Sequence, residues 1–150
     1  RMNEQTAAIG LAQLPKITRA CRELTKIGRL WDKAIADCPW LLAQQAPEGA
    51  QSTYHLWVAT FEGERHGLSR ERFVSALRAH QVPFSVGYTN MAAYQHPVFD
   101  KVFPKGTYPQ GLCPNAEHMV PRMILGYPMI PLDQARRVAD GLRKLTEELA

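Results

Sequence analysis

The sequence predicts an α+β fold of two layers, with a small, mainly antiparallel, three-stranded sheet, a long N-terminal helical segment and a C-terminal amphipathic helix. Apolar residues recur at helical spacing near both ends of the chain, and short aromatic or β-branched runs lie between them. With 150 residues, 45% hydrophobic and 21% charged, the chain has enough apolar material for one core. We therefore expect a single domain over residues 1–150, with a helical segment at 1–38 and an α+β core at 52–150.

The helical segment is expected to begin at Asn3, because an asparagine before an Ala-rich apolar run is typical of an N-cap. It should run to about Leu14. Pro15 then either kinks the helix or begins a second one that ends before Pro39, since proline lacks the amide donor of a helix interior. No initiator methionine precedes Arg1 and no signal pattern follows it, so we expect the chain to begin inside a larger architecture.

The middle of the chain alternates between strands and helices. Residues 40–52 contain a proline and a glycine and are expected to be a connection, whereas the aromatic run 54–61 is expected to be a strand. Ser69 should cap a helix that ends near His80, with Glu71 in its first turn. Alternating apolar residues over 82–88 predict the second strand.

The last third of the chain carries a long irregular segment and the clearest helix. Residues 90–111 are rich in proline, glycine and aromatic residues, which indicates a binding or covering loop. Pro114 suits the first position of a short helix over 115–120, and residues 123–129 can form a third strand broken at Gly126. The final helix has one apolar stripe, made of Leu132, Ala135, Val138, Ala139, Leu142, Leu145 and Leu149.

Several function classes are disfavoured by composition. No apolar run approaches the roughly 20 residues of a membrane span, so no membrane partner is expected. The three cysteines, Cys21, Cys38 and Cys113, are odd in number and show no ligand spacing, which supports neither a disulfide framework nor a metal site. The cytoplasm is the default location.

A net charge of +4 raises the question of nucleic-acid binding. Six cationic residues share one sector of the N-terminal helix, namely Lys16, Arg19, Arg22, Lys26, Arg29 and Lys33. The adjoining sector is apolar at the same spacings, so the stripe is explained as the solvated face of a half-buried helix. Because no aromatic platform or recognition-helix signature accompanies it, we expect no nucleic-acid partner.

Six segments, in this order and spacing, resemble the small C-terminal domain of the DegT/StrS family of pyridoxal-phosphate (PLP) sugar aminotransferases. They are RMNEQTAAIGLAQL, STYHLWVATF, LSRERFVSALRAHQVPFSVGY, YQHPVF, CPNAEHM and the closing amphipathic helix. The resemblance covers nearly the whole chain. It implies transamination of a keto sugar, usually nucleotide-linked, or of a ketocyclitol-type acceptor, with glutamate or glutamine as amino donor.

The resemblance also implies that the catalytic centre lies outside these residues. Such catalysis needs a lysine that forms a Schiff base with PLP and an acidic group on the pyridine nitrogen. In the family both belong to the large domain, upstream of Arg1. The lysines of this chain do not match the family's lysine context, so we assign no catalytic residue and expect the chain alone to bind PLP unstably and to lack transaminase activity.

Three residues could contribute to the remaining half of the site. Arg1 matches an arginine near a neighbouring subunit's cofactor or substrate phosphates, or is only a frayed terminus. Tyr88 matches the tyrosine of a His-Tyr pair in nucleotide-sugar members, or is only the end of a strand. Gly87 replaces the histidine of that pair, which favours a smaller or differently held acceptor. His96 lies in a loop near the substrate entrance of relatives, or is a local hydrogen-bond partner.

Two functions from different classes remain open at this point. One is the C-terminal part of a PLP-dependent aminotransferase; the other is a stand-alone, non-catalytic small domain that binds a sugar-like ligand or a protein. Whether the chain is itself an enzyme stays open with them. The expected partners are a large cofactor domain or further copies of the chain, because Ile9, Leu11 and Leu14 would be left exposed.

Overall fold

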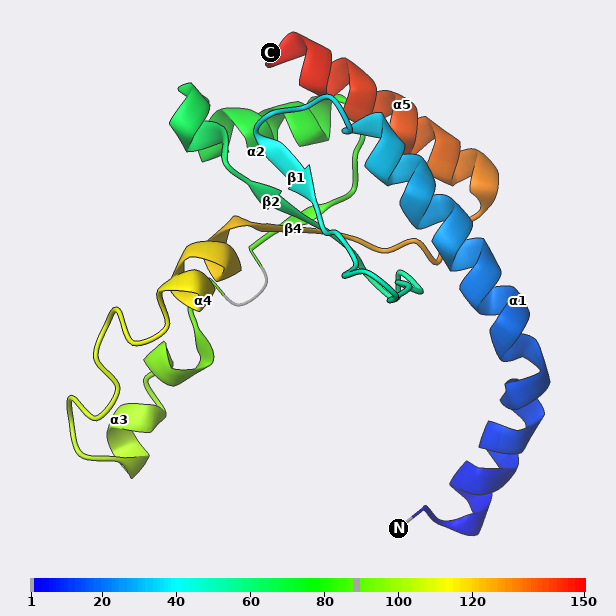
Figure 1. Cartoon of the computed structure of the whole chain (residues 1–150), viewed down its shortest axis with the longest axis horizontal. Helices are drawn as coiled ribbons and strands as arrows, with labels where there is room; N and C mark the ends of the chain where they lie inside the picture. The colour runs from blue at the N-terminus through cyan, green and yellow to red at the C-terminus, as the bar shows by residue number, and fades with distance from the viewer. Residues whose placement is uncertain (1, 88–89) are drawn as a thin grey trace.

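The computed structural model describes residues 2–87 and 90–150, and it confirms the α+β class (Figure 1). Four antiparallel strands form one sheet in the order β1-β2-β4-β3. Along β2 (Trp57–Phe61) every second residue is buried and the others are half-buried. One face of the sheet therefore carries the core, and helices α1, α2 and α5 supply its other side chains.

The fourth strand was not expected. β1 (Leu41–Ala43) lies in the segment predicted to be a connection, and it pairs with β2 so that Leu41 is opposite Phe61. Leu41 is buried and Leu42 is exposed, which is the alternation of a strand. Three residues are too few for that pattern to be recognised against the flanking polar sequence.

Helix α1 (Glu4–Ala34) is one continuous helix, so the expectation of a second helix beginning at Pro15 is wrong. The predicted cap is confirmed, because the Asn3 side chain accepts a hydrogen bond of 2.8 Å from the Thr6 amide. Pro15 removes the amide that would bond to the Leu11 carbonyl. The first five turns are exposed, so water can satisfy that carbonyl and the helix continues.

The second half of α1 is buried against α5 (Leu132–Glu148) and the sheet, as the ribbon in Figure 1 shows. Trp31 is 1% exposed, and its indole nitrogen donates a hydrogen bond of 3.0 Å to the Ala135 carbonyl. Its ring packs edge-on against Trp57 and tilted against Phe84, with ring centroids 6.0 and 5.0 Å apart.

A carboxylate beside this aromatic cluster joins α1 to the chain around β2. Asp32 accepts hydrogen bonds from the Tyr54 hydroxyl and, at 2.7 Å, from the Trp57 indole. Burial, reinforced by the bond to Asp32, raises the pKa of Tyr54 to about 12. The tyrosine therefore stays protonated and keeps donating to Asp32 at any physiological pH.

The remaining elements follow the predicted order with shorter strands. α2 (Arg70–Ala79) has the expected Ser69 cap and ends before His80. β3 (Ser85–Val86) and β4 (Met123–Gly126) are shorter than predicted, and β4 ends at the expected glycine. Within the described residues no helix is both long and apolar enough to cross a bilayer.

The final helix allows a direct test of the core. Leu142 and Leu145 are both 0% exposed on the confirmed apolar stripe of α5. Replacing either with alanine should lower the free energy of unfolding by about 2–5 kcal/mol through lost burial and a cavity. Urea denaturation measures the change. Leu112→Ala is the matched control, because Leu112 is 50% exposed and should change stability by only about 0.5 kcal/mol. Equal losses in all three variants would contradict the burial.

Candidate functional site

Residues 93–113, which precede α4 (Pro114–Met119), lie at the opposite side of the molecule from α1 and α5 (Figure 1). The segment predicted to be irregular contains a 3-10 helix at Ala93–Gln95 and the short helix α3 (Phe99–Val102). As predicted, Pro114 opens α4.

Glu117 of α4 holds this segment in place. Its carboxylate accepts a hydrogen bond from the Tyr94 hydroxyl and one of 2.7 Å from the Gly111 amide. The Tyr94 oxygen in turn accepts a bond of 3.1 Å from the Cys113 amide. Burial and the neighbouring carboxylate raise the pKa of Tyr94, so its proton remains available for Glu117. Both ends of the segment are therefore fastened to α4, and sequence reasoning missed this network.

His96 is exposed at the end of the 3-10 helix. Its Nδ1 accepts a hydrogen bond of 3.3 Å from the Val98 amide, so the local bond weighed as the alternative is present. A neutral imidazole that accepts at Nδ1 carries its proton on Nε2. The ring can therefore donate a hydrogen bond from Nε2, and a role in substrate binding stays a prediction.

The other two predicted site residues, Arg1 and Tyr88, lie outside the described residues. The structure does describe their neighbour Gly87, which has a φ of 77°. A Cβ at this position would lie 2.3 Å from Asn90 Oδ1 and 2.8 Å from Arg70 Nη2. The positive φ therefore favours glycine here, and any other residue would also have to displace the ends of the Asn90 and Arg70 side chains.

Arg70 is the functional candidate that sequence reasoning missed. It is the first residue of α2 and is half-buried, and its Nη2 donates a hydrogen bond of 3.2 Å to the Val86 carbonyl beside Gly87. Guanidinium has five N–H donors, and this bond uses one of them. The only signal in the sequence was its place directly after the Ser69 cap, which gives no indication that the side chain reaches β3.

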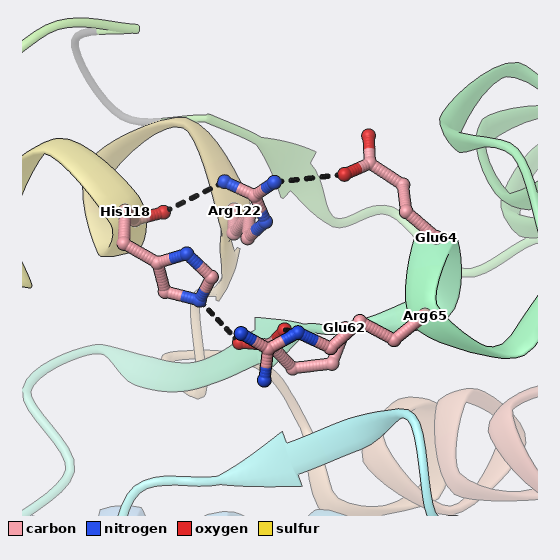
Figure 2. Close-up of polar contacts among 5 residues, drawn as sticks. All are labelled: Glu62, Glu64, Arg65, His118 and Arg122. Carbon is pink, nitrogen blue, oxygen red and sulfur yellow. Dashed lines mark hydrogen bonds and ion pairs between the residues drawn. The ribbon is translucent and has the colours of Figure 1, made fainter.

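A second polar cluster, shown in Figure 2, joins the end of β2 to α4. Glu62 is 9% exposed, and its Oε1 lies 2.6 Å from the Nε2 of His118. Its Oε2 forms an ion pair of 3.4 Å with the Arg65 side chain. The hydrogen bond from His118 is the main reason that the pKa of Glu62 is lowered. The His118 side chain is 35% exposed, although it is bonded to a buried carboxylate.

Arg122 extends this cluster along the same side (Figure 2). Its Nη1 donates a hydrogen bond of 3.1 Å to the His118 carbonyl, and its Nη2 lies 2.8 Å from Glu64 Oε2. The cluster therefore fastens α4 to the chain that follows β2. Among the described residues no group of three or more His, Cys, Asp or Glu side chains is placed to hold a metal ion.

The lowered pKa of Glu62 predicts how stability depends on pH. The carboxylate is favoured in the folded state, so its contribution is complete above its unfolded pKa of about 4.3 and is lost as pH falls through the lower folded value. Glu62→Gln should reduce the free energy of unfolding by about 1–3 kcal/mol near pH 6, and this deficit should shrink below about pH 4. Chemical denaturation over this range measures it. Glu64→Gln is the control, since Glu64 is exposed; a Glu62→Gln deficit that persists unchanged to pH 2.5 would contradict the assignment.

Comparison with solved structures shows the fold. PseC of Helicobacter pylori, an aminotransferase involved in pseudoaminic acid biosynthesis, is 20% identical with a TM-score of 0.73 over 99% of this chain and 38% of its own. An aminotransferase from Psychrobacter cryohalolentis is 17% identical with a TM-score of 0.80, and the match covers 99% of this chain and 40% of that protein. The Escherichia coli GDP-4-keto-6-deoxy-D-mannose-3-dehydratase was solved with bound hydrated PLP. It is 20% identical with a TM-score of 0.68, and the match covers 91% of this chain and 34% of that protein.

The chain thus spans well under half the length of each of these proteins. The family itself is shown by a family model, which matches residues 1–143 and so includes every element up to the last turns of α5. This match confirms the resemblance found in the sequence. The chain belongs to the DegT/DnrJ/EryC1/StrS aminotransferase family.

Proposed function

We propose that this chain is the small domain of a PLP-dependent aminotransferase that acts on a keto sugar or a ketocyclitol-type acceptor. The observation that carries the proposal is the family match over residues 1–143. The Escherichia coli neighbour supports both parts of it, because that enzyme is named for a nucleotide-linked keto sugar and was solved with PLP. The chain would contribute one wall of the site and would be inactive alone.

The lysines of this chain do not fit the attachment of PLP. A lysine that reacts with the cofactor at neutral pH needs a desolvated or electropositive pocket that favours its neutral amine. All six side chains are exposed on helices or loops, namely Lys16, Lys26, Lys33, Lys101, Lys105 and Lys144. We propose that the attachment lysine comes from a large domain, and that Arg1 contacts the cofactor or substrate phosphate there.

The acceptor would be held on the side of β3. Gly87 presents no side chain, and the Arg70 guanidinium occupies the adjacent space, where one of its five N–H donors bonds to the Val86 carbonyl. Planar donors of this kind suit a carboxylate or phosphate oxygen. Tyr88 and the Nε2 of His96 would supply further hydrogen bonds to acceptor hydroxyls. Because Gly87 has no side chain, the acceptor would be bound by Arg70, Tyr88 and His96 and not by a histidine at position 87.

The proposed partners follow from the exposure of α1. Ile9, Leu11 and Leu14 are 62–71% exposed, which leaves apolar surface for a large domain or for another copy of the chain. The alternative function is a non-catalytic domain that binds a sugar-like ligand or a protein. It is favoured by a groove beside the same helix whose lining includes the basic residues Arg22, Lys26, Arg29, Lys33 and Arg136. The two functions differ in whether catalysis appears when a large domain is added.

The proposal that the PLP-attachment lysine comes from a large domain can be tested with the purified chain and PLP. Borohydride reduction followed by peptide mass spectrometry should give only low, scattered adducts over the exposed lysines, because no lysine is placed to be activated. Adding a family large domain should restore transamination. His96→Ala should then lower activity while leaving the melting temperature unchanged, because that side chain is exposed. A stoichiometric adduct at one lysine, abolished by its substitution with arginine, would overturn the assignment.

A second test concerns the glycine beside Arg70. Gly87→Ala should cost about 1–3 kcal/mol for the positive φ and more for the contacts with Asn90 and Arg70. Gly49→Ala is matched to it, because Gly49 also has a φ of 77° but no atom within 4 Å of an added Cβ. Urea denaturation should therefore show the larger loss at position 87. Equal losses would mean that the Arg70 and Asn90 side chains move aside freely.

A further inference from the structure

Arg70 is a half-buried cation that no carboxylate balances in the part of the chain that the structure describes. Among the described arginines, Arg70 and Arg122 are half-buried and the others are exposed. Arg122 pairs with Glu64 at 2.8 Å. Arg70 forms none of the ion pairs of the described residues, and its Nη2 donates instead to the Val86 carbonyl at 3.2 Å. Because a charge withdrawn from water is stabilised more by an opposite charge than by a neutral carbonyl, Arg70 is suited to an anion that these residues do not supply.

The Arg70 guanidinium lies against a backbone that carries no side chain. Its Nη2 is 2.8 Å from the point that a Cβ of Gly87 would occupy. The Gly87 amide donates a hydrogen bond of 2.7 Å to the Met123 carbonyl, which fixes this backbone just after β3. The exposed Asn90 places its Oδ1 2.3 Å from the same point. A guanidinium and a carboxamide thus converge over one glycine, where a ligand can approach the main chain closely.

We propose that Arg70 binds an anionic substituent on the sugar ring of the acceptor, a carboxylate or a phosphate ester, and makes the reaction selective for it. The inference rests on the proposed function, because it takes the acceptor to be held beside Tyr88, the residue that follows Gly87. Guanidinium has five N–H donors in a planar fork, so a two-point contact with an anion is compatible with the bond to Val86. An acceptor without such a substituent would leave the charge of Arg70 unbalanced.

The anion site can be tested in the chain alone, by NMR of the arginine side-chain Nε–Hε groups. The probes are glucuronate, glucose 6-phosphate and glucose, which differ in the anionic substituent. Both anions should shift the Arg70 resonance with an affinity at least about tenfold higher than that of glucose. Arg70→Lys keeps the charge but loses the planar fork, and should weaken anion binding by about tenfold. Arg72→Lys is the matched control, because Arg72 is exposed on the same helix, and it should change binding by less than about twofold.

Selectivity is tested with the chain and an added large domain of the family. Keto sugars with a ring carboxylate, with a phosphate ester and with neither are compared as acceptors. Arg70→Lys should raise KM for the anionic acceptors by about tenfold more than it raises KM for the neutral one, and Arg72→Lys should not. Circular dichroism and thermal melting show whether each variant is folded. The two anionic acceptors distinguish a carboxylate from a phosphate ester as the preferred substituent.

The outcomes separate this inference from the proposed function. Transamination whose preference for anionic acceptors is the same in Arg70→Lys would overturn the inference and leave the proposed function standing. No transamination of any acceptor, with an anion-dependent shift of Arg70 in the chain alone, would overturn the proposed function and support the anion site.

Three further results would also overturn the inference. The Arg70 resonance could stay unmoved by about 20 mM of either anion, with Arg70→Lys lowering only the melting temperature, which would mean that the arginine is purely structural. Arg70→Lys and Arg72→Lys could weaken anion binding alike, which would mean nonspecific attraction to surface charge. Uridine diphosphate could shift the resonance at lower concentration than both sugars, which would assign Arg70 to a nucleotide phosphate.

Discussion

The indole ring of Trp31 lies where α1, the sheet and α5 meet, and the layers of the domain are positioned by what it contacts. Its nitrogen donates a hydrogen bond to the Ala135 carbonyl of α5, and its ring packs edge-on against Trp57 of β2 and tilted against Phe84 beside β3. The close packing of these rings also explains the glycine at position 126, because a Cβ there would approach both Phe84 and Trp31 within 3 Å. A smaller side chain at position 31 would leave a cavity and an unsatisfied carbonyl at once.

The half of the domain farther from Trp31 is held by polar bonds in addition to ring contacts among Phe99, Phe103 and Tyr108. Glu62 and Glu117 each receive hydrogen bonds from side chains of other segments, and together they fasten α4 and the long segment before it to β2. Carboxylates occupied in this way serve to hold structure. This use is consistent with the proposal that the chain would be inactive alone.

Helix α1 meets two environments along one stretch of sequence. One face carries Ile27, Trp31 and Ala34 into the core, and the opposite face carries exposed cations and exposed leucines. Alternation at helical spacing predicted this division, and a solvated basic face was the simplest interpretation. The structure adds that the basic face borders a groove, because the 51–53 loop and Leu132 lie against this part of α1. Segments distant in the sequence therefore form a groove together with the basic face of α1.

Local patterns in the sequence determined the α+β class, the Asn3 and Ser69 caps, the stripe of α5 and the resemblance to the family, because caps and periodicity depend on residues a few positions apart. Tertiary structure decided what depends on distant partners. β1 is a strand because its backbone pairs with that of β2. α1 continues through Pro15 because water reaches the Leu11 carbonyl that Pro15 leaves without a donor. His118 is hydrogen-bonded because the buried Glu62 carboxylate lies next to it. Arg70 likewise lies beside Gly87 because its side chain, at the start of α2, reaches the Val86 carbonyl of β3, a contact that no spacing along the chain encodes.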